Sequence, residues 1–202
     1  MSFRNEPQIT DPRVLRALAH PVRTAILSRL YVGPATATEC SETVGESPSA
    51  CSYHLRKLAS LGFVEEEPSS DGRERRWKVK VTGYTYELGD TPGQRAAAAT
   101  LRRHLLEVSA QRLNEYLVTE ASHDAEWIEA ATIMTSSMYM TVDELKELYA
   151  RIRDLLDPYF ERVDPSRRPP ETTRVAFHMY AVPWPQDVDW EAGEIDDKPR
   201  DG

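Results

Sequence analysis

Residues 47–64 read SPSACSYHLRKLASLGFV, and the pattern of this stretch decides the fold. The opening Ser-Pro pair is typical of a helix start, because serine caps free backbone N–H groups and proline suits the first helical position. Cys51, Leu55 and Leu58 recur at helical spacing and predict one apolar face. Gly62 stands where a glycine commonly ends a helix. The stretch therefore predicts a short amphipathic helix.

The opposite face of this helix is small, hydroxylated and basic. Such a face fits the major groove of DNA, since small side chains allow close approach and arginine can bond guanine at two points. Arg56 is the predicted base contact, and the hydroxyl groups are expected to hold phosphates. The predicted DNA-contacting residues of the helix are Ser47, Ser49, Ala50, Ser52, Tyr53, Arg56 and Lys57.

Two strand-like runs follow, residues 63–67 and 75–81, and the Asp-Gly turn between them predicts a β-hairpin. Residues 73–80 (RERRWKVK) carry five positive charges against one negative charge. A basic hairpin beside a polar helix can hold phosphates on both sides of a groove. We expect phosphate contacts from Arg73, Arg75 and Arg76.

Three helices are predicted before this stretch. Asp11-Pro12 and His20-Pro21 read as helix starts, and Gly33-Pro34 stops the second helix. A third helix runs from about Thr38 to Val44. Three helices, a fourth and a hairpin occur in the order of a winged helix-turn-helix, with the fourth helix as the reader of DNA.

A different organisation is predicted after residue 90. Thr91-Pro92 opens a long helix reaching about Thr119, whose two apolar rows suit contact with its own subunit and with a partner. A strand over 131–140, a helix opened by a capping box at Thr141, and an alternating strand over 173–182 follow. The predicted class is α+β: a winged helix-turn-helix domain over 8–88, a dimerisation helix over 91–120, a small strand-helix-strand domain over 121–185 and an acidic tail over 186–202.

Methionine and aromatic side chains gather in and beside the two predicted strands. One interpretation is that they cover the apolar face of the helix over 142–157. The other is an apolar pocket for a small organic effector, which such adaptable side chains suit. The predicted pocket residues are Trp127, Met138, Met140, Phe177 and Met179.

The charge is unevenly distributed along the chain. The net charge is −8, but residues 1–90 hold 12 basic and 12 acidic residues, so the excess acid lies in the second half. Local basic patches govern DNA binding because charges are screened within about 8 Å at physiological salt. The polar N-terminus, the lack of a long apolar run and the presence of two cysteines predict a cytoplasmic protein.

Two segments resemble a known family. Residues 11–27 (DPRVLRALAHPVRTAIL) resemble the LKALAHPxRxxIL opening of ArsR-type winged-helix repressors, and residues 47–64 are similar to that family's recognition helix. The resemblance covers about residues 8–85. It implies a homodimer that binds a double-stranded DNA operator, usually as a repressor released by an effector. The part beyond residue 120 looks like longer members that add a strand-helix-strand segment.

Metal sensing is tested against the same resemblance. The family's thiolate pair on the third helix falls at Thr36 and Thr38, whose hydroxyl groups bind soft metals poorly. His104 and Glu107 reproduce only one fragment of the family's pattern on the long helix. We therefore expect neither a metal nor another cofactor.

Three other functions are weighed. Cys40 and Cys51 fall on inward faces of adjacent helices and predict either two small buried side chains or a redox-responsive pair. Glycine-rich phosphate loops and the GxSxG and HExxH motifs do not occur in the sequence, so we predict no enzyme. A winged helix used for protein contacts is the main alternative, and the arginine-rich hairpin favours DNA instead.

Overall fold

The computed structural model describes residues 7–67, 75–81 and 83–183. The N-terminal part contains β1 (Gln8–Ile9), α1 (Pro12–Leu18), α2 (Pro21–Leu30), α3 (Ala37–Val44), α4 (Pro48–Ser60), β2 (Val64–Glu67), β3 (Arg76–Val79) and β4 (Thr85–Tyr86). The remainder contains α5 (Pro92–Thr119), α6 (Ala125–Ala130) and α7 (Val142–Phe160), with the 3-10 turns η2 (Glu120–Ser122), η3 (Glu161–Val163) and η4 (Pro165–Arg167).

Side-chain caps fix the helix starts at the predicted residues. The Asp11 carboxylate accepts the Arg13 N–H at 2.8 Å, and Ser47 Oγ accepts the Ala50 N–H at 3.2 Å. α3 begins at Ala37, one residue before the predicted start at about Thr38, and Thr36 caps it. Gly62 has a φ of 81°, which L-residues with side chains rarely adopt, so it ends the turn after α4 at little cost. The six helices predicted by periodicity are confirmed.

A winged helix-turn-helix is formed by α1 to α4 and the hairpin. β2 and β3 pair antiparallel, with Val64 opposite Val79, and Ala35 forms a further bridge with Trp77. This bridge attaches the hairpin, here called the wing, to the turn between α2 and α3. The core beneath these elements is formed by Leu15, Leu18, Ile26, Leu30, Ala35, Cys40, Cys51, Leu55, Leu58, Phe63, Val64 and Trp77.

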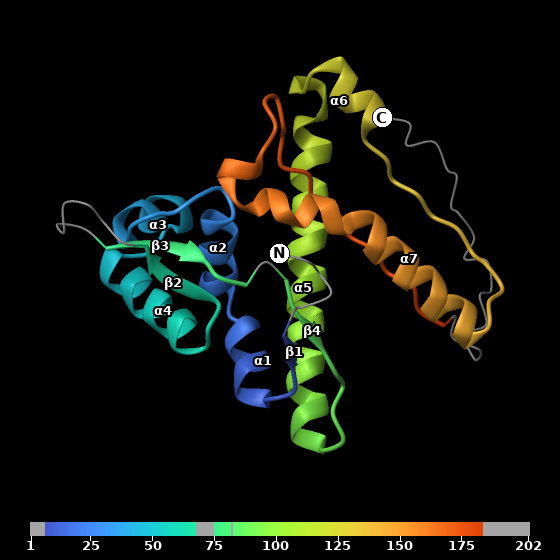
Figure 1. The fold of residues 1–202 in the computed structure, drawn as a ribbon, viewed down its shortest axis with the longest axis horizontal. Coiled ribbons are helices and arrows are strands. Elements are labelled where there is room, and N and C mark those ends of the chain that lie inside the picture. Colours follow the sequence, from blue (N-terminus) through green and yellow to red (C-terminus); the bar gives the residue numbers. More distant parts are fainter. Residues whose placement is uncertain (1–6, 68–74, 82, 184–202) are drawn as a thin grey trace, which may run out of the picture.

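The long helix α5 belongs to this core over its first half. α1 packs along it, and α5 contributes the buried side chains of Ala97, Ala98 and Leu101. The parallel pair β1–β4, which sequence patterns did not predict, ties residues 8–9 to residues 85–86. In Figure 1 the winged helix lies on one side of α5, and α7 crosses α5, so that its C-terminal end lies on the side of the winged helix and its N-terminal part extends away on the other. α5 therefore connects the winged helix-turn-helix to the rest of the chain.

The chain over residues 110–183 buries no side chain within one protomer. The runs at 131–140 and 173–182 form no β-ladder, so the two strands predicted there are wrong for the isolated chain. Alternating residues supply one face of a strand, but the backbone N–H groups still need a neighbouring strand. The helix predicted between these runs, α7, is confirmed with its capping box at Thr141. α6, which precedes both runs, was not predicted from the sequence.

Candidate nucleic-acid interface

α4 presents two unlike faces. Cys51, Leu55 and Leu58 are fully buried against the neighbouring helices. On the other side the Tyr53 ring is 58% exposed. Of the predicted contacts on this helix, Ser47, Ser49, Tyr53, Arg56 and Lys57 are exposed, and Ala50 and Ser52 are half-buried. The structure thus brings the predicted residues of α4 together on one accessible surface.

A hollow of about 190 Å³ lies where α3, α4 and the wing meet. Arg56 from α4 and Arg75 from the wing line it, and Ser52 and Thr38 add hydroxyl groups. The other lining residues are Thr36, Ala37 and Trp77. The Arg56 Nε–H donates to the Ser52 carbonyl at 3.2 Å, which lays the arginine along its own helix. Two guanidinium groups and several hydroxyls around one hollow are donors suited to phosphate oxygens.

The sequence pattern marks Thr36 and Thr38 only as poor metal ligands and does not predict their position at this hollow. Their place before and within the first turn of α3, next to the helix that carries Arg56, was the available signal.

The wing is less basic than its sequence indicates, because β2 places glutamates beside the basic residues of β3. Arg75 pairs with Glu66 at 3.2 Å. Glu65 lies 3.6 Å from the Lys78 ammonium and 3.8 Å from that of Lys80. The run Val64-Glu-Glu-Glu67 could have revealed this pairing, since hairpin neighbours face one another. Arg73 lies outside the described residues.

Arg76 differs from Arg75 in its surroundings. Its guanidinium donates to the Pro34 carbonyl at 2.7 Å and to the Glu39 carboxylate at 3.3 Å. Glu39 also accepts the Thr36 N–H at 2.8 Å, and this bond is the largest of the effects that lower the pKa of the Glu39 carboxyl. Arg76 therefore fastens the wing to the start of α3, and the expectation that it is free to hold a phosphate finds no support in this geometry.

A pair of histidine rings joins the recognition helix to α2. His20 and His54 lie with their ring centroids 4.7 Å apart, and the Nδ1 atom of each ring is buried without a hydrogen-bond partner. Burial lowers the pKa of both imidazoles, and the charge of Arg23 lowers them further. This geometry places His54 in helix packing.

The thiols of Cys40 and Cys51 are buried and unpaired. Burial raises the pKa of the Cys40 thiol to about 11 and also raises that of Cys51. A protonated, inaccessible thiol is a poor target for oxidants, which favours the packing role over the redox-responsive one. In residues 7–67, 75–81 and 83–183, no group of three or more histidine, cysteine or acidic side chains is arranged to hold a metal ion.

The five residues of the predicted effector pocket do not enclose a cavity among themselves in one protomer. Their side chains are all exposed, from 39% for Trp127 and Met179 to 65% for Met138. Met140 and Phe177 are 40% and 60% exposed.

Across the described part of the chain, no helix is long and apolar enough to cross a lipid bilayer.

Comparison with known proteins assigns the N-terminal part of the chain. Residues 18–67 match the model of a helix-turn-helix domain family. Over 50 residues the chain is 46% identical to the HTH-type transcriptional regulator NmtR of Mycobacterium tuberculosis. Residues 18–67 are therefore similar to the helix-turn-helix domain of a transcriptional regulator. The alignment with NmtR spans 25% of this chain and 42% of that regulator, so it concerns the domain alone.

Solved structures show more distant likenesses. The homodimeric winged helix-turn-helix domain of a possible ArsR-family regulator from Mycobacterium bovis is 20% identical, with a TM-score of 0.32 over 56% of this chain and 88% of that one. ZitR of Lactococcus lactis, a zinc-responsive MarR family member, is 15% identical, with a TM-score of 0.30 over 67% and 74%.

Proposed function

We propose that the protein is a sequence-specific transcriptional regulator that binds double-stranded DNA as a homodimer. The observation that carries the proposal is the exposed face of α4 beside a hollow lined by Arg56 and Arg75. In this arrangement α4 enters the major groove, Arg56 reaches a base edge, and the hollow receives a backbone phosphate. The proposal contains no catalytic step and no cofactor.

The proposed dimer rests on the apolar surface of the second half. The outer row of α5 leaves Leu106, Leu113 and Leu117 between 41% and 49% exposed. Between residues 106 and 183, 19 large apolar side chains are exposed. If a partner covered about 100 Å² of each, the interface would bury about 4,000 Å² over both protomers, within the range of obligate dimers. A two-fold dimer would place its two recognition helices about 34 Å apart, one turn of DNA.

Repression and release by an effector are the finer parts of the proposal. We propose repression from the resemblance of residues 11–27 and 47–64 to ArsR-type repressors. The effector pocket at Trp127, Met138, Met140, Phe177 and Met179 stays a prediction, and a second protomer would have to complete it, because these side chains are exposed in one.

A selection experiment tests the function. Purified full-length protein is incubated with fragments of its own genome, and bound fragments are sequenced and verified by gel shift. We expect a common palindromic site bound at nanomolar concentration, at least a thousandfold tighter than random DNA. Equal affinity for all fragments, or no binding at low salt, would contradict the proposal.

A protein-binding winged helix is the second candidate, and the wing favours it in one respect. Every basic side chain of the wing that the structure describes has an acidic neighbour, so its attraction for phosphate is reduced. Glu65→Gln separates the two functions. If the wing binds DNA, the variant should bind DNA more tightly, because Lys78 and Lys80 lose their shared carboxylate. If the wing binds protein, neither the wild type nor the variant should bind DNA.

A further inference from the structure

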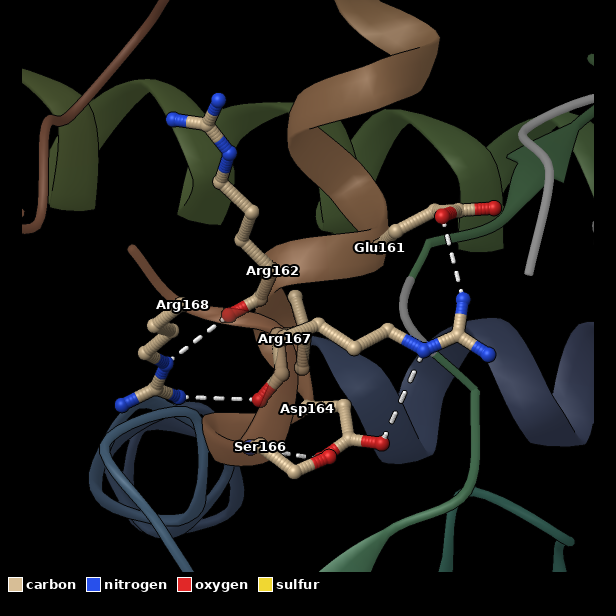
Figure 2. A network of polar contacts seen from close by, with 7 residues as sticks. Glu161, Arg162, Asp164, Ser166, Arg167 and Arg168 are labelled. Atoms are coloured by element: carbon tan, nitrogen blue, oxygen red, sulfur yellow. Dashed lines mark hydrogen bonds and ion pairs between the residues drawn. The ribbon is translucent and has the colours of Figure 1, made fainter. Parts of the chain in front are cut away.

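An arginine-rich turn follows α7 and is held in one conformation by its own side chains. Figure 2 shows Asp164 capping this turn, where its carboxylate accepts the Ser166 N–H at 2.9 Å. The Arg167 guanidinium pairs with carboxylates of the same turn, 3.0 Å from that of Glu161 and 4.0 Å from that of Asp164. Arg168 also donates inside it, to the carbonyls of Arg162 and Val163 at 2.8 Å each.

Arg168 is the residue that reaches from this turn to the winged helix. Its two terminal nitrogens donate to the Val32 carbonyl at 2.8 Å and the Tyr31 carbonyl at 2.9 Å. Those carbonyls follow the end of α2, where backbone oxygens lack helical partners and the helix dipole is negative. A planar guanidinium, which is permanently charged, can donate at once to carbonyls of its own turn and to those after α2. The ammonium group of a lysine lacks this planar, forked set of donors.

The turn that Arg168 holds also carries the DNA-facing elements. Within residues 31–36, Ala35 exchanges two backbone hydrogen bonds with Trp77 of the wing, at 2.9 and 2.8 Å. The Pro34 carbonyl accepts from Arg76 of the wing at 2.7 Å. Thr36 caps α3, which packs against the recognition helix α4. The wing, the start of α3 and the C-terminal turn therefore meet at one six-residue segment.

Two further contacts bind the following segment to the same region. Arg174 donates to the Ser28 carbonyl of α2 at 2.8 Å, and its guanidinium lies 5.7 Å from the centroid of the Tyr31 ring. The Tyr180 hydroxyl is hydrogen-bonded to Ser109 of α5. Residues 168–180 are thus attached to α2 and α5 by side chains far apart in the sequence.

We infer that Arg168 is a positioning residue for DNA binding, which holds the 31–36 turn and through it sets the orientation of the wing relative to α4. The inference rests on the proposed function. Arg168 itself does not face the hollow lined by Arg56 and Arg75. Its effect on DNA arises from preorganisation: with the turn held, less order has to be gained when the wing meets the phosphates. A change in the segment after α7 is transmitted to the wing through these contacts.

Arg168→Ala tests the inference, with Arg167→Ala as the matched control that removes an arginine from the same turn without touching α2. Hydrogen exchange of the free protein is followed at residues 31–36 and 75–79. We expect Arg168→Ala to speed exchange there about tenfold, and Arg167→Ala to leave it within about twofold. Unchanged exchange in Arg168→Ala, or an equal effect of both substitutions, overturns the inference. If Arg168→Ala does not fold, Arg168→Lys, which keeps the charge but loses the fork, is expected to show the same exchange.

DNA affinity is the second readout. Arg168→Ala should bind the selected site about five- to tenfold more weakly, with the wild-type dependence on salt. A salt slope lowered by about one would instead make Arg168 a direct phosphate contact and overturn the positioning role. If the wild-type protein bound no DNA, the proposed function would fail, while faster exchange in Arg168→Ala would still establish the coupling between the C-terminal turn and the wing.

Discussion

Arg76→Ala is expected to lower the stability of the fold, whereas Arg75→Ala is expected to weaken DNA binding. The two arginines are adjacent in sequence but differ in what they contact. Arg76 donates to the Pro34 carbonyl at 2.7 Å and pairs with Glu39 at 3.3 Å. Arg75 pairs across the wing with Glu66, and its side chain is 74% exposed.

The magnitude for Arg76 follows from these contacts. A hydrogen bond from a charged donor contributes about 1.5–3 kcal/mol when buried, and the lower end applies because the Arg76 side chain is 41% exposed. The Glu39 ion pair adds at most about 0.5 kcal/mol because both partners are partly exposed. A loss of about 1.5–2 kcal/mol corresponds to a fall in melting temperature of about 3–8 °C for a chain of this size. Arg75→Ala removes an exposed pair and should change the melting temperature by less than about 2 °C.

The assay compares the two variants in thermal melts followed by circular dichroism, at one fixed protomer concentration because dimerisation also affects stability. Titrations with the selected DNA site at several salt concentrations accompany the melts. Arg75→Ala should lower the salt slope by about one unit. The reasoning is refuted if Arg76→Ala has the melting temperature of the wild type and if Arg76→Ala, rather than Arg75→Ala, lowers the salt dependence of DNA binding.

Three further outcomes are expected. Arg56→Ala should weaken binding by about 1–3 kcal/mol and relax the preference at one base pair, and a uniform loss over all sequences would remove its assignment to a base edge. Because burial lowers the pKa of His20 and His54, the unfolded chain takes up protons more readily, so stability is complete above about pH 6.5 and falls as the pH drops below it. His54→Phe should flatten this fall in melts between pH 7.5 and 5.5, and an unchanged slope would show that other groups cause it. Leu113→Asp should give monomers in light scattering at micromolar concentration while Asn114→Asp, the same charge one residue away, does not; a monomeric wild type would contradict the dimer.

Local signals in the sequence are sufficient to predict the helices of the winged helix-turn-helix. Capping residues such as Asp11 and Ser47, and the helical repeat of Cys51, Leu55 and Leu58, act within one turn and need no distant partner. The exposed face of α4 follows directly from the same repeat. For this reason the predicted contacts on α4 lie together in the structure.

Features that depend on distant pairing were missed. β1 and β4 are two residues each and lie 77 positions apart in register, too short and too distant for a pattern to reveal. The alternation of residues 173–182 predicted a strand, but alternation cannot supply a partner strand. Likewise Arg168 looks like one of many surface arginines in the sequence, and only the fold brings it to Tyr31 and Val32.

Because the apolar surface of α5 and α7 is uncovered in one protomer, the lifetime of the protein should depend on its concentration. In the proposed dimer this surface is shielded, but a protomer without a partner presents it to proteases and to other exposed chains. In such a dimer the fraction of paired chains falls as total protein falls, and the unpaired chains would be degraded soonest. Occupancy of a DNA site would therefore decline more steeply than synthesis, so that a modest decrease in expression acts as a sharp off-signal.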